Sequence, residues 1–574
     1  MSKQKPSIPK GTRDFGPEAV SKRNYIIDII KSVYQLYGYQ PLETPVMENL
    51  STLMGKYGEE GDKLLFKIIN SGDYLKDVDS GYLQERNSNK MLTQISEKGL
   101  RYDLTVPFAR YVVMNQNELA FPFKRYQIQP VWRADKPQKG RYREFYQCDA
   151  DVIGSNSLML DAEMVMMIAD VFDKLNLSVT IRLNNRKILD GLNEYIGETE
   201  KNVELVTAID KLDKVGLDGV EAELKEKEFT SDQINKIKTL LSYSGDTSGK
   251  IEFLENIFTG EKGTKGISEI KSLFEKLQGV ASEKIQIQFD LTLARGLSYY
   301  TGTIYEVVSN EVKIGSILGG GRYDDLTGIF GLPNMSGVGI SFGLDRIYDV
   351  ITELNRFPAA ALSNTQVLFI PFDADAEQFA IAYARQLRTE NIRCEVYPDL
   401  NAKMGKKFKY ADDKKIPYTA VIGSNEMAEE KVALKNMSTG AQKLVTLQEL
   451  ISELNGESGF ADGEMAWNSF NKPLKIKKIH WCGSASNWED TSGKIHPTQK
   501  PVKLYSWQLQ EYATEGMKLL DTHFGSGSIA LAVDKANRLD KMNLHLTACE
   551  IDKEYIDKAI KRISESIKQG TLSF

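Results

Sequence analysis

The chain has 574 residues, of which 41% are hydrophobic and 26% are charged. This length can fill several hydrophobic cores at about 150 residues per domain, which excludes a disordered chain and a small disulfide-bonded scaffold. Lysine and arginine together number 73 against 79 acidic residues, and the net charge is −6. A chain so nearly balanced does not bind nucleic acid or membrane through its overall charge, so a nucleic-acid partner would need a local basic surface.

The cysteines and the N-terminus indicate the compartment. Cys148, Cys394, Cys482 and Cys549 form no CxxC pair. They therefore predict neither a disulfide framework nor a zinc site, and they fit a reducing environment. The N-terminus has no apolar signal segment, and no run of 18 apolar residues occurs. We therefore expect a cytoplasmic protein with no membrane partner.

The first half of the chain predicts a helix followed by strand-rich segments. Apolar residues recur at helical spacing over 23–37, and residues 38–46 predict a strand whose two prolines favour an edge or an interface. Residues 121–153 predict two strands joined by a long basic loop, and 158–175 a helix. Residues 185–284 are mostly helical and highly charged, which indicates an insertion between strand-rich halves.

The second half predicts two further α/β regions. Residues 284–326 contain three strand patterns and a glycine turn, and a strand that leads into a helix follows at 337–354. After a linker, strands and helices alternate over 365–455, which predicts a small domain with a largely parallel or mixed sheet. A boundary falls at 456–459, and the remaining tail contains another strand, glycine turn and helix.

Three arginines carry the first chemical signal. Arg133, Arg295 and Arg346 lie in or next to predicted strands with apolar and glycine neighbours. A randomly chosen arginine is most often a surface ion-pair partner, but this sequence context favours arginines of a binding or catalytic site. Arginine is always charged and binds phosphate or carboxylate through paired hydrogen bonds, so the set suits an enzyme that handles phosphates and an amine-bearing substrate.

Five segments, in order over about residues 5–455, resemble the histidyl-tRNA synthetase family. They are PKGTRDFGPEA near the start, LRYDLTVPFARY at 100–111, FKRYQIQPVWRADKPQKGRYREFYQCDADVIG at 123–154, LARGLSYYTGTIYEV at 293–307, and GGGRYDDL with GVGISFGLDR at 319–346. They include the three signature motifs of the second structural class of aminoacyl-tRNA synthetases. The resemblance implies a histidine–tRNA ligase that uses ATP and Mg²⁺, binds L-histidine and tRNA(His), and forms a homodimer through its proline-bearing first motif.

The resemblance also assigns the residues that contact ATP. Arg133 matches the arginine that holds the α-phosphate, and Arg346 matches the one that holds the γ-phosphate. Arg295 matches the additional arginine of this family, which supports the α-phosphate during the attack. Asp135 replaces the usual glutamate near the adenine, and Phe145 matches the aromatic residue that stacks on the base. Arg133, Arg295 and Arg346 are thus the expected catalytic residues.

For histidine, the resemblance implies a pocket that contacts the amino group and the imidazole. Its expected residues are Asp103, Leu104, Thr105, Gln147, Asp151, Tyr299 and Tyr300. Asp151 stands where many bacterial members have glutamate, which resembles the eukaryote-like branch. A neutral imidazole offers one hydrogen-bond donor and one acceptor. Another side chain would leave buried polar groups of the pocket unpaired, so these groups can select histidine over other amino acids.

Candidate tRNA contacts lie in three places. The basic loop contributes Lys136, Gln138, Lys139 and Arg141. Its composition alone indicates a solvated loop, but the resemblance implies that this loop approaches the acceptor end of tRNA. The 185–284 insertion is either a solvated helical face or a clasp on the acceptor arm. In the small domain, which resembles an anticodon-binding domain, the candidates are Lys406 and Lys407, with Lys403 and Lys409 beside them.

Residues 457–574 resemble the C-terminal half of an amino-methylating DNA methyltransferase. The four histidines of the chain all lie there (His480, His496, His523 and His545), and the segment HPTQKP begins at His496. Residues matching an S-adenosylmethionine site are Asp521, Phe524, Gly525, Gly527 and Glu550. The catalytic motif of such enzymes contains Pro-Pro, and this chain has no such dipeptide. We therefore expect a remnant without methyl transfer, with neither S-adenosylmethionine nor DNA as a required partner; retained cofactor binding is the alternative.

The expected fold class is α/β, with an α+β catalytic domain on an antiparallel sheet. The expected parts are a class II catalytic core at 1–184 plus 285–357, a helical insertion at 185–284, an α/β anticodon-binding domain at 365–455 and a truncated, partly Rossmann-like tail domain at 457–574. Two other functions remain open: a non-catalytic paralogue that senses tRNA or regulates another enzyme, and a bifunctional protein with a cofactor-binding methyltransferase module.

Overall fold

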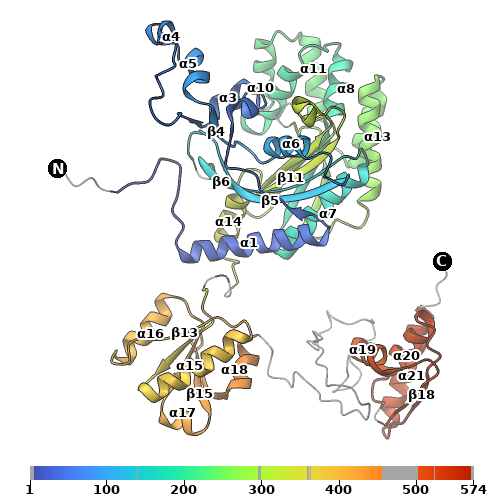
Figure 1. The fold of residues 1–574 in the computed structure, drawn as a ribbon. Coiled ribbons are helices and arrows are strands. Elements are labelled where there is room, and N and C mark those ends of the chain that lie inside the picture. The colour runs from blue at the N-terminus through green and yellow to red at the C-terminus, as the bar shows by residue number, and fades with distance from the viewer. Residues whose placement is uncertain are drawn as a thin grey trace. The chain divides into compact units, whose positions relative to one another are not determined.

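The computed structural model describes residues 6–138, 140–294, 299–358, 361, 363–455, 502–522 and 524–569. The chain divides into two compact units, Met1–Asp462 and Gly463–Phe574. Within the described residues, no helix is long and apolar enough to cross a membrane. Figure 1 shows the fold of each unit.

An eight-stranded sheet forms the centre of the first unit, in the order β1-β5-β6-β11-β10-β9-β7-β8. Its strands are β1 (Gln40–Pro41), β5 (Phe123–Trp132), β6 (Glu144–Ile153), β7 (Val179–Asn185), β8 (Ile285–Phe289), β9 (Thr303–Ser309), β10 (Leu318–Tyr323) and β11 (Gly337–Gly343). The inner neighbours pair antiparallel, and only the edge strands β1 and β8 pair parallel. The expected antiparallel sheet and the paired strands of 121–153 are therefore confirmed.

The two faces of the sheet differ in polarity because side chains alternate along a strand. On β6, Cys148, Ala150 and Val152 are buried in the main hydrophobic core. This core is completed on the same face by α1 (Pro17–Leu36), α7 (Leu158–Lys174) and α14 (Leu344–Glu353) (Figure 1). The intervening residues of β6 point to the opposite face, which is therefore the polar one.

The first motif does not form the expected strand over 38–46. Only β1 (Gln40–Pro41) joins the large sheet there, and β2 (Met47–Asn49) belongs to a separate three-stranded sheet with β4 (Lys98–Leu100) and β3 (Lys67–Ile68). The prolines explain the difference, because proline has no N–H to donate to a neighbouring strand. The short helices of this region are α2 (Leu50–Leu53), α3 (Gly58–Leu64), α4 (Ser80–Gln84), α5 (Ser88–Ile95) and α6 (Thr105–Met114).

The insertion is helical, as its composition indicates. It contains α8 (Arg186–Ile196), α9 (Asn202–Asp210), α10 (Leu212–Glu226), α11 (Ser231–Leu241), α12 (Thr247–Ile257) and α13 (Glu261–Lys276). These helices share their own hydrophobic core, and side-chain caps start three of them: Asn185 on α8, Thr230 with a capping box on α11, and Asp246 on α12.

Residues 365–455 form a five-stranded mixed sheet in the order β13-β12-β14-β15-β16. The elements are β12 (Val367–Pro371), α15 (Ala374–Thr389), β13 (Cys394–Val396), α16 (Met404–Asp413), β14 (Tyr418–Ile422), α17 (Ser424–Ala428), β15 (Lys431–Asn436), β16 (Gln442–Thr446) and α18 (Leu447–Leu454). The mixed sheet was expected, but the antiparallel hairpin of β15 and β16 was not.

The described part of the second unit contains α19 (Val502–Tyr512), β17 (Lys518–Asp521), α20 (Ser528–Leu539), β18 (His545–Ala548) and α21 (Lys553–Gln569). Its two strands pair parallel, and α19 and α20 share a small core with them. The strand, glycine turn and helix expected after residue 517 are therefore present.

Candidate functional site

A cavity of about 310 Å³ opens on the polar face of the large sheet. Of the expected residues, its lining contains Asp103, Thr105, Arg133, Asp135, Arg141, Phe145, Gln147, Asp151, Tyr299, Tyr300 and Arg346. Leu104 does not line it: its side chain is buried, and its carbonyl accepts a hydrogen bond from Arg125. Arg295 and Lys139 lie outside the described residues. The structure therefore gathers residues from four separate sequence motifs around one space.

Two arginines are fixed on the wall of the cavity. Arg133 follows β5, its Nε donates to the Tyr102 carbonyl at 3.1 Å, and its guanidinium lies 4.2 Å from the centre of the Tyr102 ring. Arg346 lies in the first turn of α14, and its guanidinium donates to the carbonyls of Gly140 at 3.1 Å and Ser316 at 2.5 Å. Arginines held in place before a ligand arrives can bind phosphate oxygens without the cost of ordering them.

The basic loop is attached to the same wall. Arg141 Nη2 donates to Asp135 Oδ1 at 2.7 Å, and Arg143 Nε donates to the Asp135 backbone carbonyl at 3.0 Å. The Asp135 side chain is buried, whereas that of Arg141 is 46% exposed. Lys136 and Gln138 are exposed as well. The loop thus presents its charges to solvent while one end of it is held at the cavity.

Asp103 is a buried carboxylate with two protein donors. Its Oδ1 accepts from the Tyr57 hydroxyl at 3.0 Å and from the Val106 backbone N–H at 3.1 Å. Burial raises the pKa of Asp103, although the Val106 hydrogen bond and the charge of Arg133 oppose that shift. Sequence reasoning missed Tyr57 because nothing in its local sequence distinguishes it from a core tyrosine.

Gln147, Asp149 and Asp151 form a row of polar side chains along β6, all lining the cavity. Asp151 accepts from the Tyr323 hydroxyl at 2.8 Å and pairs with Arg125 Nη2 at 2.7 Å. Sequence reasoning assigned roles to Gln147 and Asp151 but not to Asp149. The signal was available, because the three positions alternate and must share one face of the strand.

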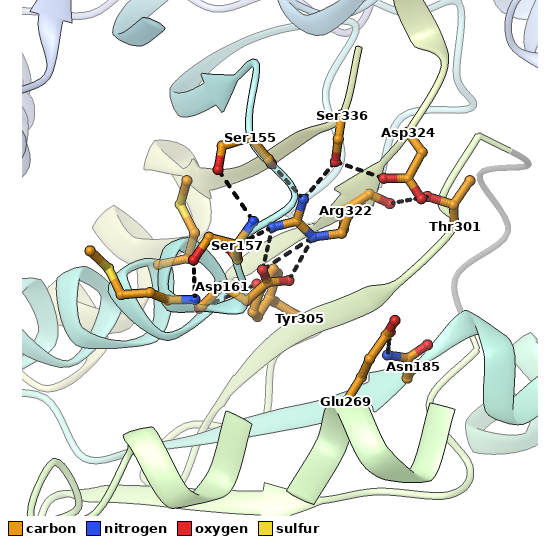
Figure 2. A network of polar contacts seen from close by, with 12 residues as sticks. Ser155, Ser157, Asp161, Asn185, Glu269, Thr301, Tyr305, Arg322, Asp324 and Ser336 are labelled. Atoms are coloured by element: carbon orange, nitrogen blue, oxygen red, sulfur yellow. Dashed lines mark hydrogen bonds and ion pairs between the residues drawn. The ribbon is translucent and has the colours of Figure 1, made fainter. Parts of the chain in front are cut away.

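A buried network holds the segment that carries Tyr299 and Tyr300 (Figure 2). Arg322 on β10 contacts both oxygens of Asp161 on α7, and its Nη1 donates to Ser336 Oγ at 2.6 Å. Ser336 and Thr301 each donate a hydroxyl hydrogen bond of 2.7 Å to Asp324. Thr301 directly follows Tyr300, so this network fixes the position where the tyrosine pair enters the cavity wall.

No set of protein side chains in the described part of the chain is arranged as a metal cage of three or more His, Cys, Asp or Glu residues. Mg²⁺ is commonly held by substrate phosphates with only one or two carboxylates and several waters. A Mg²⁺ ion bound in this way would need only one or two carboxylates from the chain.

Two lysines of α16, Lys406 and Lys407, differ in their exposure to solvent. Lys406 is 70% exposed, as a phosphate contact requires. Lys407 is 2% exposed, and its ammonium donates to the carbonyls of Pro371 at 3.0 Å and Leu400 at 3.2 Å. Lys407 is therefore corrected from an expected tRNA contact to a structural residue, because its charge is already satisfied inside the domain.

In the second unit, residues 521–522 and 524–527 come together with Glu550 at the carboxyl ends of β17 and β18. Glu550 Oε2 accepts from the Gly525 backbone N–H at 2.8 Å, and Gly527 (φ 74°) is the N-cap residue of α20. The Phe524 N–H donates to the Cys549 carbonyl at 3.0 Å. His496 and the segment HPTQKP lie outside the described residues.

The mostly antiparallel sheet, with two fixed arginines facing a cavity and a separate mixed-sheet domain after it, defines a class II aminoacyl-tRNA synthetase. A family model described as Histidyl-tRNA synthetase matches residues 86–347, and an anticodon binding domain model matches 366–457. The chain is 55% identical to the histidine–tRNA ligase of Phocaeicola vulgatus, over 78% of this chain and 98% of the relative. The chain belongs to the histidyl-tRNA synthetase family.

Further matches agree with this assignment. The histidine–tRNA ligase of Christiangramia forsetii is also 55% identical, over 79% of this chain and 99% of the relative. The crystal structure of histidyl-tRNA synthetase from Nostoc sp. PCC 7120 matches with a TM-score of 0.67 and 30% identity, covering 79% of this chain and 100% of that one. A Bacillus halodurans structure titled ATP phosphoribosyltransferase regulatory subunit/histidyl-tRNA synthetase matches at 21% identity, which shows the shared fold alone.

Proposed function

We propose that this chain is a histidine–tRNA ligase that activates L-histidine with ATP and then transfers it to the 3′ end of tRNA(His). The observation that carries the proposal is one cavity lined both by fixed arginines, Arg133 and Arg346, and by buried acceptors, among them Asp103 and Gln147. Such a cavity can hold phosphates at one set of residues and a cationic amino acid at the other. The family relation supports the same activity.

In the first step, the histidine carboxylate attacks the α-phosphate of ATP in line, and pyrophosphate leaves. No protein nucleophile takes part, so the residues act by positioning the reactants and by stabilising the charge that builds on the phosphate oxygens. We assign α-phosphate binding to Arg133 and γ-phosphate binding to Arg346, with Phe145 against the adenine. Mg²⁺ bound to the ATP phosphates would supply further charge neutralisation.

In the second step, the ribose hydroxyl of tRNA attacks the adenylate carbonyl. We propose that the exposed loop residues Lys136, Gln138 and Arg141 approach the acceptor end, and that Lys406 contacts the anticodon arm. Their exposed positions support this assignment. We also propose the domain division into a catalytic core (1–184 with 285–357), a tRNA-clasping insertion (185–284) and an anticodon-binding domain (365–455), in a homodimer.

The non-catalytic alternative is less well supported. A paralogue that only senses tRNA is expected to lose its substrate contacts, whereas Arg133, Arg346, Gln147 and Tyr300 are all present on the cavity wall.

We propose that residues 457–574 are a remnant of an amino-methylating DNA methyltransferase that does not transfer methyl groups. The hydrogen bond from Gly525 to the Glu550 carboxylate supports descent from a nucleotide-binding turn. Calorimetric titration of the full chain with S-adenosylmethionine tests whether binding persists. No heat of binding is expected; heat that disappears in Glu550→Ala would show a retained site.

Charging of a tRNA(His) transcript tests the main proposal. The wild-type chain is expected to attach radiolabelled histidine to the transcript, whereas Arg133→Ala is expected to lose about a hundredfold or more in rate. The matched control is Arg538→Ala, which removes an exposed arginine that pairs with Asp534 on α20. No charging by the wild-type chain would refute the proposal.

A further inference from the structure

The N-terminal segment of residues 9–15 lies against the basic loop between β5 and β6. The Arg143 backbone N–H donates to the Gly11 carbonyl at 2.9 Å, and Arg143 Nη1 donates to the Lys10 carbonyl at 3.5 Å. Gly11 has a φ of +89°, and a Cβ atom there would lie 2.9 Å from both Arg143 Cγ and Pro137 Cγ. Only glycine allows this approach, so the segment and the loop are in close contact.

Arg13 joins this loop to the start of α14. Its guanidinium carbon lies 3.3 Å from the centre of the Tyr142 ring and 4.8 Å from the centre of the Phe15 ring. Arg13 Nη2 also donates to Asp345 Oδ1. Tyr142 and Asp345 both line the cavity, and Asp345 directly precedes Arg346. One side chain of the N-terminal segment thus contacts two parts of the cavity wall.

Asp345 has a second cationic partner. Arg23 on α1 donates to Asp345 Oδ1 at 2.5 Å, and the Tyr146 backbone N–H donates to Oδ2 at 3.3 Å. Arg23 and Asp345 are 6% and 5% exposed, whereas the Arg13 side chain is 26% exposed. Loss of Arg13 would therefore leave the buried carboxylate paired with Arg23, so the fold does not depend on Arg13 to compensate this charge. The loss would remove the contact with Tyr142.

The basic loop forms part of the expected ATP site. Asp135, Gly140 and Arg141 line the cavity, and Arg346 Nε donates to the Gly140 carbonyl at 3.1 Å. Because Arg346 is also assigned to the γ-phosphate, its guanidinium would hold the loop and the ligand together. A second attachment through Arg13 would keep the loop in place before ATP binds, and a site that is ordered in advance binds its ligand more tightly.

We propose that Arg13 is a positioning residue for ATP binding, which holds Tyr142, and with it the basic loop, against the start of α14. This inference rests on the proposed function and deepens it. It gives a role to the N-terminal segment PKGTRDFGPEA, to which the sequence assigned no ligand contact. Without Arg13, ATP itself would have to order the loop, which weakens ATP binding and leaves histidine binding unchanged.

Pyrophosphate exchange with the full chain tests the proposal. In Arg13→Leu the ATP KM is expected to rise about tenfold, whereas the histidine KM should stay within about twofold. A merely structural role would lower the folded fraction of the enzyme, which reduces kcat but changes neither KM. The matched control is Arg356→Leu, an exposed arginine that pairs with Glu311 at 2.7 Å, and it should leave both KM values unchanged.

Two further variants show whether Arg13 acts through Tyr142. Tyr142→Leu should itself raise the ATP KM, and adding Arg13→Leu to it should cause less than about a further threefold rise, because both changes remove one contact. Arg13→Lys keeps a cation beside Asp345 but loses the flat guanidinium face, so its ATP KM should rise about threefold. Should Arg13→Leu fail to fold by circular dichroism, Arg13→Lys decides in its place, and an unchanged ATP KM would then overturn the proposal.

The outcomes separate the two proposals. Wild-type exchange with an unchanged ATP KM in Arg13→Leu, an equal rise of both KM values, or additive effects in the double variant overturns the role of Arg13 and leaves the ligase activity standing. Absence of histidine-dependent exchange in the wild-type chain overturns the proposed function, and the role of Arg13 falls with it.

Discussion

Replacing Arg322 by methionine should destabilise the first unit strongly. Its side chain is 4% exposed and contacts both carboxylate oxygens of Asp161, which is fully buried. It also donates to the carbonyls of Ser155 at 3.1 Å and Ser157 at 3.2 Å (Figure 2). Removing one member of a buried ion pair leaves the other charge without compensation and costs about 3–5 kcal/mol, and complete burial of Asp161 favours the upper part of that range.

Urea unfolding followed by circular dichroism measures this loss. Arg322→Met should lower the free energy of unfolding by about 3–5 kcal/mol, and Asp161→Leu should cost a similar amount. The double variant should cost clearly less than the sum of the two, because it leaves no unpaired buried charge. A loss below about 1 kcal/mol in Arg322→Met, or additive losses in the double variant, would refute the reasoning.

Three further predictions follow from single contacts. Arg346→Ala should reduce kcat for pyrophosphate exchange about 10²- to 10³-fold without a change in the melting temperature. Burial raises the pKa of Asp324, but the hydrogen bonds from the Thr301 and Ser336 hydroxyls outweigh burial, so the pKa in the folded state is lowered. Ionised Asp324 therefore stabilises the fold at any pH above the pKa of this group in the unfolded chain. This stabilisation is lost as the pH falls through the lower pKa of the folded state. Asp324→Asn should accordingly narrow the stability difference between pH 7 and pH 3 in thermal melts. Lys406→Ala should weaken tRNA binding and reduce its salt slope by about one, whereas Lys407→Ala should lower the melting temperature instead.

The sequence predicts the helices and strands whose apolar residues recur with a clear periodicity, and it misses those that depend on packing against distant parts of the chain. The strands β5 and β6 follow from alternation, and the insertion helices follow from their spacing and charge. The strand expected over 38–46 is cut short to β1, because its prolines have no N–H to donate and the pairing with β5 ends at Pro41. The hairpin of β15 and β16 was missed because β16 is short and mostly exposed, with Val445 as its one buried residue, and therefore carries little apolar pattern.

The same distinction applies to the site. Motifs locate Arg133, Arg346 and Gln147, because each lies in a segment whose local pattern is distinctive. Asp149 was overlooked and Lys407 was wrongly assigned for a common reason. Whether a charged side chain lies in a cavity, in the core or in solvent depends on residues distant in the sequence, such as Ser341 for Asp149 and Pro371 for Lys407.

Histidine-dependent exchange of pyrophosphate into ATP tests the central claim most directly, since it requires the histidine pocket and the phosphate-binding arginines in the same cavity. The wild-type chain should catalyse the exchange with L-histidine and with none of the other standard amino acids, and Arg133→Ala should slow it about a hundredfold or more. Exchange that does not depend on histidine, or that is unaffected by Arg133→Ala, would contradict the account.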